Sequence, residues 1–135
     1  PSNQSALEGY VVAQARGEAP YFMDANRSLL KLYQFVPQST QYDKVALILL
    51  LALLEFPATD VLALRYLIPD RVQKMEPCKQ ILHCAGLLGS CKFAEFWREF
   101  RTIQGNDVLK VLAGPASTEK LQRAIVQVLA LSYRT

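Results

Sequence analysis

Apolar residues recur along this chain mainly at the three- and four-residue spacing of α-helices, and alternating strand-like runs are nearly absent. The clearest stripe lies between Ser90 and Gly105, where the polar residues take the opposite face. Its apolar members are Phe93, Phe96, Trp97, Phe100 and Ile103. This spacing predicts an amphipathic helix that ends at Gly105.

Capping and breaking residues divide the remainder of the chain into further helices. The expected helices cover about residues 5–16, 24–35, 43–54, 59–67, 77–89, 90–104, 107–113 and 117 onward, with a loop and a helical turn over 69–76. The expected N-terminal caps are Ser5, Asp24, Thr40, Thr59, Ser90 and Ser117. Gly17, Pro37 and Gly89 stop three of these helices, and Gly114-Pro115 is expected to be a hard break.

The run Val45–Leu54 is apolar on every side, and such a helix has to be enclosed by others. It is too short to span a bilayer, which takes about 20 residues. Short loops make successive helices antiparallel neighbours. The pattern therefore predicts an all-α fold of stacked helical hairpins, either a compact bundle or a short HEAT-like solenoid, without a strict internal repeat.

The last helix carries a wider apolar arc than a surface helix needs. Leu121, Ala124, Ile125 and Val128 form one stripe on this helix. Val126, Leu129 and Tyr133 extend the arc well beyond about 100°. We expect these three side chains to pack on something that follows Thr135, and the chain to be part of a longer protein.

Composition and charge restrict the possible functions but do not indicate a binding or catalytic site. The chain has 135 residues, is 51% hydrophobic and 20% charged, and carries a net charge of +3. Its loose basic concentration consists of Arg65, Arg71, Lys74 and Lys79, with Asp70 and Glu76 among them. A dedicated nucleic-acid site has a denser basic stripe. A solvated face is the favoured interpretation, and incidental RNA contact by these four residues is the lesser alternative.

Candidate chemistry is sparse. His83 and Cys84 are adjacent in a predicted helix, so their side chains point about 100° apart and do not form a dyad. Cys78, Cys84 and Cys91 lack the spacing of a zinc site. The sequence predicts no catalytic residue, metal, cofactor or small-molecule substrate, and three cysteines without a secretory signal favour a reducing compartment.

Aromatic residues indicate surfaces for protein partners rather than for bases, because no strand platform displays them. Tyrosine combines an apolar ring with a polar tip. The candidates for partner-facing positions are Tyr33, Phe35, Tyr42 and Tyr133.

Two stretches of the chain resemble a known family. The segment Asp24–Phe35 ends in Lys31, Leu32, Tyr33, Gln34 and Phe35. The preceding segment, Leu7–Arg16, shows the same resemblance in its sequence. About sixty residues later come Phe93, Phe96 and Trp97, after Gln80-Ile-Leu. In order and approximate spacing these residues resemble the subunit K family of eukaryotic translation initiation factor 3.

The resemblance implies a HEAT-like helical domain over residues 1–135, lacking the family's first helix and its C-terminal winged-helix domain of the PCI type. The residues that carry the resemblance would be mostly structural. It also implies a non-catalytic cytoplasmic subunit that binds other subunits of the factor, especially subunit L, and reaches the small ribosomal subunit through the 43S preinitiation complex. A PCI-type scaffold of the proteasome lid or the signalosome is the alternative that shares this architecture.

Overall fold

The computed structural model describes residues 2–107, 109–110, 112 and 114–134, with the side chains of 2 and 132–134 left out. Within that part the chain is helical and contains no strand, which confirms the predicted all-α class. Its elements are α1 (Ser2–Ala15), α2 (Met23–Phe35), the 3-10 turn η1 (Pro37–Ser39), α3 (Tyr42–Leu53), α4 (Asp60–Arg65), α5 (Asp70–Gln73), α6 (Cys78–Gly89), α7 (Phe93–Gln104) and α8 (Pro115–Arg134). No helix among the described residues has the length and apolar character needed to cross a bilayer.

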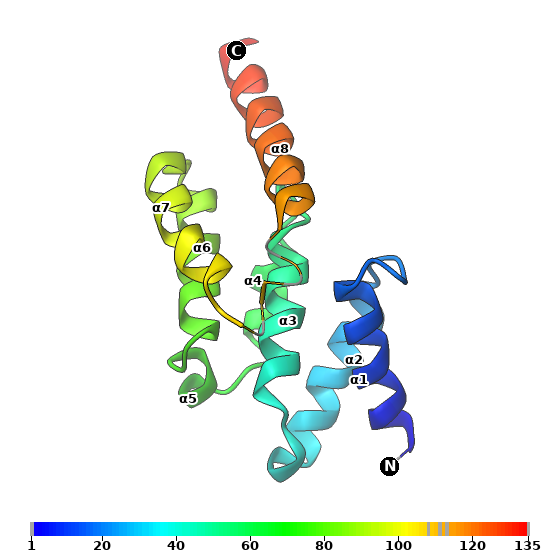
Figure 1. Ribbon diagram of the computed structural model, residues 1–135. Coiled ribbons are helices and arrows are strands. Elements are labelled where there is room, and N and C mark those ends of the chain that lie inside the picture. Colours follow the sequence, from blue (N-terminus) through cyan, green and yellow to red (C-terminus); the bar gives the residue numbers. More distant parts are fainter. Residues whose placement is uncertain (1, 108, 111, 113, 135) are drawn as a thin grey trace.

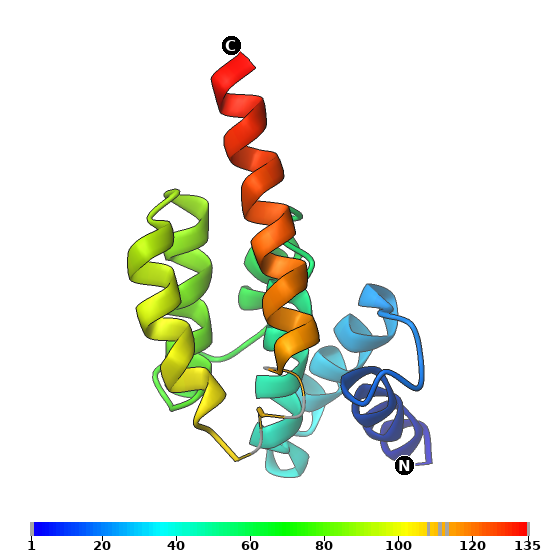
Figure 2. The same cartoon turned by 45° about the horizontal axis from the view of Figure 1, so that its top comes forward.

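The helices form two hairpins on either side of α3 (Figure 1). α1 and α2 pack against one another, and α1 also packs along α3. On the other side, α6 packs on α3 and pairs with α7. α4 lies against α3 and α6, and the single-turn α5 lies against α6. α8 leaves this body and projects beyond it in both views (Figures 1 and 2).

α3 is the centre of the core, as its uninterrupted apolar run predicts. Every residue from Val45 to Leu54 is buried, and half of them have no exposed surface. A helix with no polar face has to be covered on all sides, and α1, α2, α4 and α6 all touch this one. The burial of α3 is therefore the main apolar contribution to folding.

Polar contacts fix the angle between α1 and α2. α1 ends at Ala15, and Gly17 in the following turn has a φ of 76°, the left-handed conformation that favours glycine. The side chains of Gln14 and Asn26 are buried and exchange two hydrogen bonds, of 2.7 and 3.1 Å. The Gln14 Oε1 atom also accepts the backbone N–H of Phe22 at 3.0 Å, so one amide joins both helices and their loop.

Aromatic packing holds the α6–α7 hairpin together. Phe96, Phe100 and Ile103 are fully buried, and the Phe96 and Phe100 rings stack with centroids 5.4 Å apart. The chain turns between the two helices through Cys91, whose φ of 59° is left-handed. The N–H groups of Cys91 and Lys92 bond the carbonyls of Leu88 and Leu87 there, a helix end at which glycine is usual.

The predicted helix starts are partly wrong. α1 begins at Ser2, so Ser5 is not its cap, and Asp24 lies inside α2. Gln41 and Lys92 occupy the N-cap positions of α3 and α7 instead of Thr40 and Ser90. Thr59 is at the N-cap of α4 but makes no side-chain capping bond. Tertiary packing, rather than hydroxyl caps, sets these boundaries.

The region between α7 and α8 also differs from its prediction. Asp107, Leu109, Lys110 and Leu112 lie in turns rather than in a helix, and residues 108, 111 and 113 lie outside the described part. α8 begins at Pro115, where a break was predicted and Ser117 was the expected cap. Proline suits the first turn of a helix, because the N–H it lacks would have no helical partner there.

Candidate partner-binding surfaces

α8 is attached to the body through its first turns. Leu121 and Ile125, one turn apart, are buried and belong to the core. The Gln104 Nε2 atom of α7 donates to the Thr118 hydroxyl at 3.2 Å. Lys120 forms an ion pair with Glu55, which follows α3. These contacts hold the N-terminal half of the helix on α7 and the end of α3.

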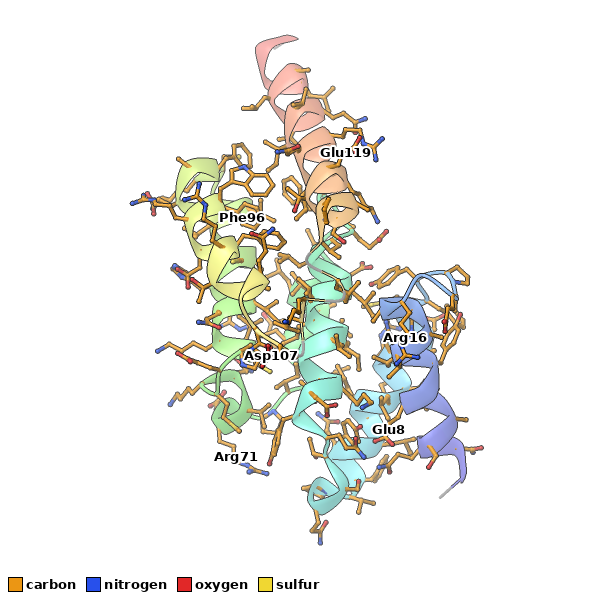
Figure 3. All side chains as sticks on the ribbon, in the orientation of Figure 1. Glu8, Arg16, Arg71, Phe96, Asp107 and Glu119 are labelled. Atoms are coloured by element: carbon orange, nitrogen blue, oxygen red, sulfur yellow. The ribbon has the colours of Figure 1, made fainter. Side chains whose placement is uncertain are left out.

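The C-terminal half of α8 presents apolar side chains to solvent. Val126, Leu129 and Leu131 are 62%, 41% and 63% exposed, and we call these three residues the α8 surface. Figure 3 shows side chains around the part of α8 that extends beyond α7. Tyr133, which belongs to the same predicted arc, has its side chain outside the described part. Val126 and Leu129 are therefore uncovered in this chain, and their packing on a further domain stays a prediction.

The α8 surface extends around more than one side of the helix. At about 100° per residue, Val126 lies about 140° from Leu121 in one direction and Leu131 about 80° in the other. Single exposed apolar residues are common, but a group of them on one projecting segment is typical of an interaction site. Leu131 was missed in the sequence, although the same helical wheel places it outside the buried stripe.

The four basic residues do not form one patch. Arg65, Lys74 and Lys79 line an open pocket of about 710 Å³ between α4 and α6. Arg71 instead points out at the lower edge of the molecule in Figure 3, where its Nη1 atom donates to the Tyr42 hydroxyl at 3.3 Å. The structure therefore separates one of the four cations from the other three.

Carboxylates balance the charge of the pocket that holds the other three cations. Asp70, Glu76 and Glu99 line it as well. Polyanion binding depends on an excess of cations at the phosphates, and this pocket offers as many negative as positive groups. Its composition fits a hydrated, charged surface better than an RNA site.

The family-like signature residues differ widely in burial. Phe96 is fully buried and Phe93 and Trp97 are partly buried in the α6–α7 hairpin. Tyr33 is only 4% exposed and donates its hydroxyl hydrogen bond to the Glu8 carboxylate, so the prediction that it lies at an exposed edge is wrong. Phe35, two residues later, is 84% exposed and remains a partner-facing candidate.

The two buried thiols, Cys78 and Cys84, are not activated as nucleophiles. Burial, together with the negative charge of Glu99, raises the pKa of the Cys84 thiol to about 12. Burial likewise raises the pKa of Cys78 to about 11. A reactive cysteine needs a shift in the opposite direction. Among the described residues there is also no group of three or more histidine, cysteine or carboxylate side chains arranged to hold a metal ion.

This chain is similar in sequence to proteins of a known family. The family model described as the CSN8/PSMD8/EIF3K family matches residues 39–135. Eukaryotic translation initiation factor 3 subunit K of Homo sapiens is 35% identical over 134 residues, which cover 99% of this chain and 59% of that protein. The subunit K proteins of Dictyostelium discoideum and Aedes aegypti are 35% and 30% identical over 117 and 135 residues, covering 87% and 100% of this chain. The chain spans 46% and 59% of the length of those two proteins.

Proposed function

The chain belongs to the CSN8/PSMD8/EIF3K family, and we propose that it works as a non-catalytic scaffold subunit of eukaryotic translation initiation factor 3. The observation that carries this proposal is the identity of 35% with subunit K, extended over 99% of the chain. In this role it binds other subunits of the factor, especially subunit L. It reaches the small ribosomal subunit through the 43S preinitiation complex, in the cytoplasm.

The arrangement of the helices supports a scaffold role. The apolar residues of α3 and one face of each hairpin form the core, and the buried thiols have raised pKa values. The features left for function are surfaces, and the α8 surface presents three exposed apolar residues on one helix. In the proposed role the protein binds other proteins and does not catalyse a reaction.

The proposed occupant of the α8 surface is the winged-helix domain that the resemblance implies. The chain spans 59% of the human relative's length, so that relative has further sequence available to cover such a face. In that arrangement Val126, Leu129, Leu131 and Tyr133 pack on the domain, and the 135-residue module supplies the helical arm that holds it.

Co-purification tests the proposed role. A tagged copy of the protein at its natural length, expressed in the cells it comes from, is expected to bring down subunit L and the small ribosomal subunit. Recovery of proteasome-lid or signalosome subunits instead would establish the alternative PCI-type scaffold. Repeated failure to recover either subunit L or the ribosomal subunit would disprove the role in initiation.

Cysteine labelling tests the occupant of the α8 surface. The variants carry Cys91→Ser, because Cys91 is an exposed thiol that would itself be labelled. In that background a cysteine placed by Val126→Cys is expected to react rapidly with a maleimide in the 135-residue chain and slowly in the natural-length protein. The control is Glu18→Cys in the loop between α1 and α2, where Glu18 is exposed, and it should react rapidly in both. Equal labelling of the Val126→Cys variant in the two proteins would show that no domain covers this face.

A third function, direct RNA binding, has weaker support. It would depend on Arg65, Lys74 and Lys79, which share their pocket with three carboxylates, and on Arg71, which lies elsewhere. If it occurred, the affinity would fall steeply with salt concentration. Affinity for a short single-stranded RNA that is absent or insensitive to salt would eliminate it.

A further inference from the structure

A second surface lies on the opposite part of the molecule from the α8 surface. A groove of about 320 Å³ runs between the end of α2, η1, the start of α3 and the segment joining α4 to α5, and we call it the α2–α5 groove. Its apolar lining consists of Leu30, Tyr33, Pro37, Val45, Leu67, Ile68, Pro69 and Val72. Gln34, Thr40 and Arg71 complete the lining.

The core holds the walls of the α2–α5 groove in place. Leu30, Ile68 and Val72 are buried members of the hydrophobic core. The Gln34 Nε2 atom donates to the Leu67 carbonyl at 3.0 Å and so ties α2 to the opposite wall. A groove fixed in this way needs little reorganisation to accept a ligand, which lowers the entropic cost of binding.

Arg71 is the only charged residue in the lining of the α2–α5 groove. Its guanidinium donates to the Tyr42 hydroxyl, and no carboxylate of the described residues forms an ion pair with it. Arginine has several N–H donors in a planar fork that suits a carboxylate. The groove therefore combines an apolar floor with one cation whose acidic partner is not in the described part of this chain.

Exposed apolar residues adjoin the lining residues of the groove in the sequence. Phe35 and Val36 lie between the lining residues Gln34 and Pro37, and they are 84% and 45% exposed. Tyr42, which holds Arg71, is 37% exposed. A peptide chain that places a carboxylate on Arg71 would also cover the exposed part of Tyr42.

We propose that the α2–α5 groove binds a peptide segment of another protein, which inserts an apolar side chain and places a carboxylate on Arg71. A single cation in an apolar lining does not suit a polyanion, since nucleic acid needs several phosphate contacts. It suits one acidic residue next to one or two large apolar ones. The inference does not depend on the role in initiation, because it rests on the groove alone.

The test begins with a displayed library of random 12-residue peptides, selected on the immobilised 135-residue chain. The enriched peptides are then synthesised with a fluorescent label, and their affinities are measured by fluorescence polarisation. The expected consensus holds a large apolar residue and an aspartate or glutamate close to it. A basic or uncharged consensus, or no enrichment, would overturn the proposal.

Substitutions on both partners locate the binding site. Arg71→Glu is expected to weaken binding at least about fivefold, because it replaces an attraction by a repulsion. Changing the acidic residue of the peptide to lysine should restore affinity for this variant. Thr40→Trp, which fills the groove from its edge, should also weaken binding, and Arg101→Glu on exposed α7 is the control that should not.

Two further comparisons separate charge recognition from a change in shape. Tyr42→Phe removes the hydrogen bond to Arg71 but keeps the cation, so it is expected to change affinity less than Arg71→Glu does. Circular dichroism should show that all variants unfold at similar temperatures. Equal weakening by Tyr42→Phe and Arg71→Glu, or peptide binding that ignores Arg71→Glu and Thr40→Trp, would refute carboxylate recognition in the groove.

Discussion

α3 and α8 are both rich in apolar residues, yet these residues are buried in α3 and largely exposed in α8. All residues of α3 from Val45 to Leu53 are buried, whereas Leu121 and Ile125 are the buried residues among the described side chains of α8. α3 has neighbours on every side, and α8 projects past the body after its first turns (Figures 1 and 2). Apolar content alone therefore does not tell whether a helix belongs to the core or to an interface.

The difference has a physical consequence. Apolar burial stabilises the fold by roughly 25 cal/mol for each Å² removed from water, so α3 contributes to folding and the α8 surface does not. The α8 surface instead keeps that free energy available for association. Substitutions in the two helices are expected to separate stability from binding.

The largest expected effect is in amide hydrogen exchange. The amides of α3 should exchange only when the whole chain unfolds, while those of Val126 to Leu131 open by local fraying. For a domain of ordinary stability the exchange rates of the two groups should differ by roughly a thousandfold or more. Hydrogen–deuterium exchange of the 135-residue chain measures this ratio, and equal protection would mean that α8 is as firmly held as α3.

Truncation of one side chain in each helix gives the next comparison. Ile48→Ala in α3 removes fully buried methyl groups and leaves a cavity, so it should lower the free energy of unfolding by about 2–5 kcal/mol. Leu131→Ala in α8 changes an exposed side chain and should lower it by less than about 0.5 kcal/mol. Urea unfolding measures both, and a similar loss in the two variants would contradict the contrast between the helices.

The buried amide pair of the α1–α2 joint should show an intermediate effect. Gln14→Ala leaves the Asn26 side chain and the Phe22 N–H without their partner, which should cost about 1–3 kcal/mol. Gln127→Ala on exposed α8 is the matched control, with an expected change near zero. A neutral Gln14→Ala variant in thermal unfolding would show that water replaces the pair without loss.

The smallest effect is expected where α8 joins the body. Lys120 and Glu55 are 49% and 30% exposed, and exposed ion pairs contribute about 0–1 kcal/mol. Lys120→Ala should therefore lower the free energy of unfolding by less than about 1 kcal/mol. This loss should be smaller at high salt, which screens the ion pair. A larger loss would mean that this pair, rather than the burial of Leu121 and Ile125, holds α8 in place.

Periodicity predicted most of the helices, because each buries a face whose spacing is written in the sequence. α2, α3, α6 and α7 lie within a few residues of their predicted bounds. The caps were predicted less well, since hydroxyl residues near a helix start were assumed to bond its amides. α7 starts after Lys92 and α8 at Pro115, where packing and backbone geometry set the boundary.

The candidate surfaces were only partly visible in the sequence. The excess apolar arc of α8 indicated Val126 and Leu129, because a regular helix fixes which residues share a side. The α2–α5 groove had no such signal, since its residues come from four segments between Leu30 and Val72. The exposure of Tyr66 also had no signal in the sequence. Tyr66 is 86% exposed directly after α4, although Leu64, two residues earlier, is fully buried.

The sequence by itself determined the all-α class, the enclosed α3 and the apolar excess of α8, since all three depend on residues close together in the chain. Only the tertiary structure decided that Tyr33 is buried while Phe35 is exposed, and that Arg71 is separated from Arg65, Lys74 and Lys79. It also decided that α8 is held at one end and uncovered at the other. These outcomes depend on which helices become neighbours, and that is set by contacts between residues far apart in sequence.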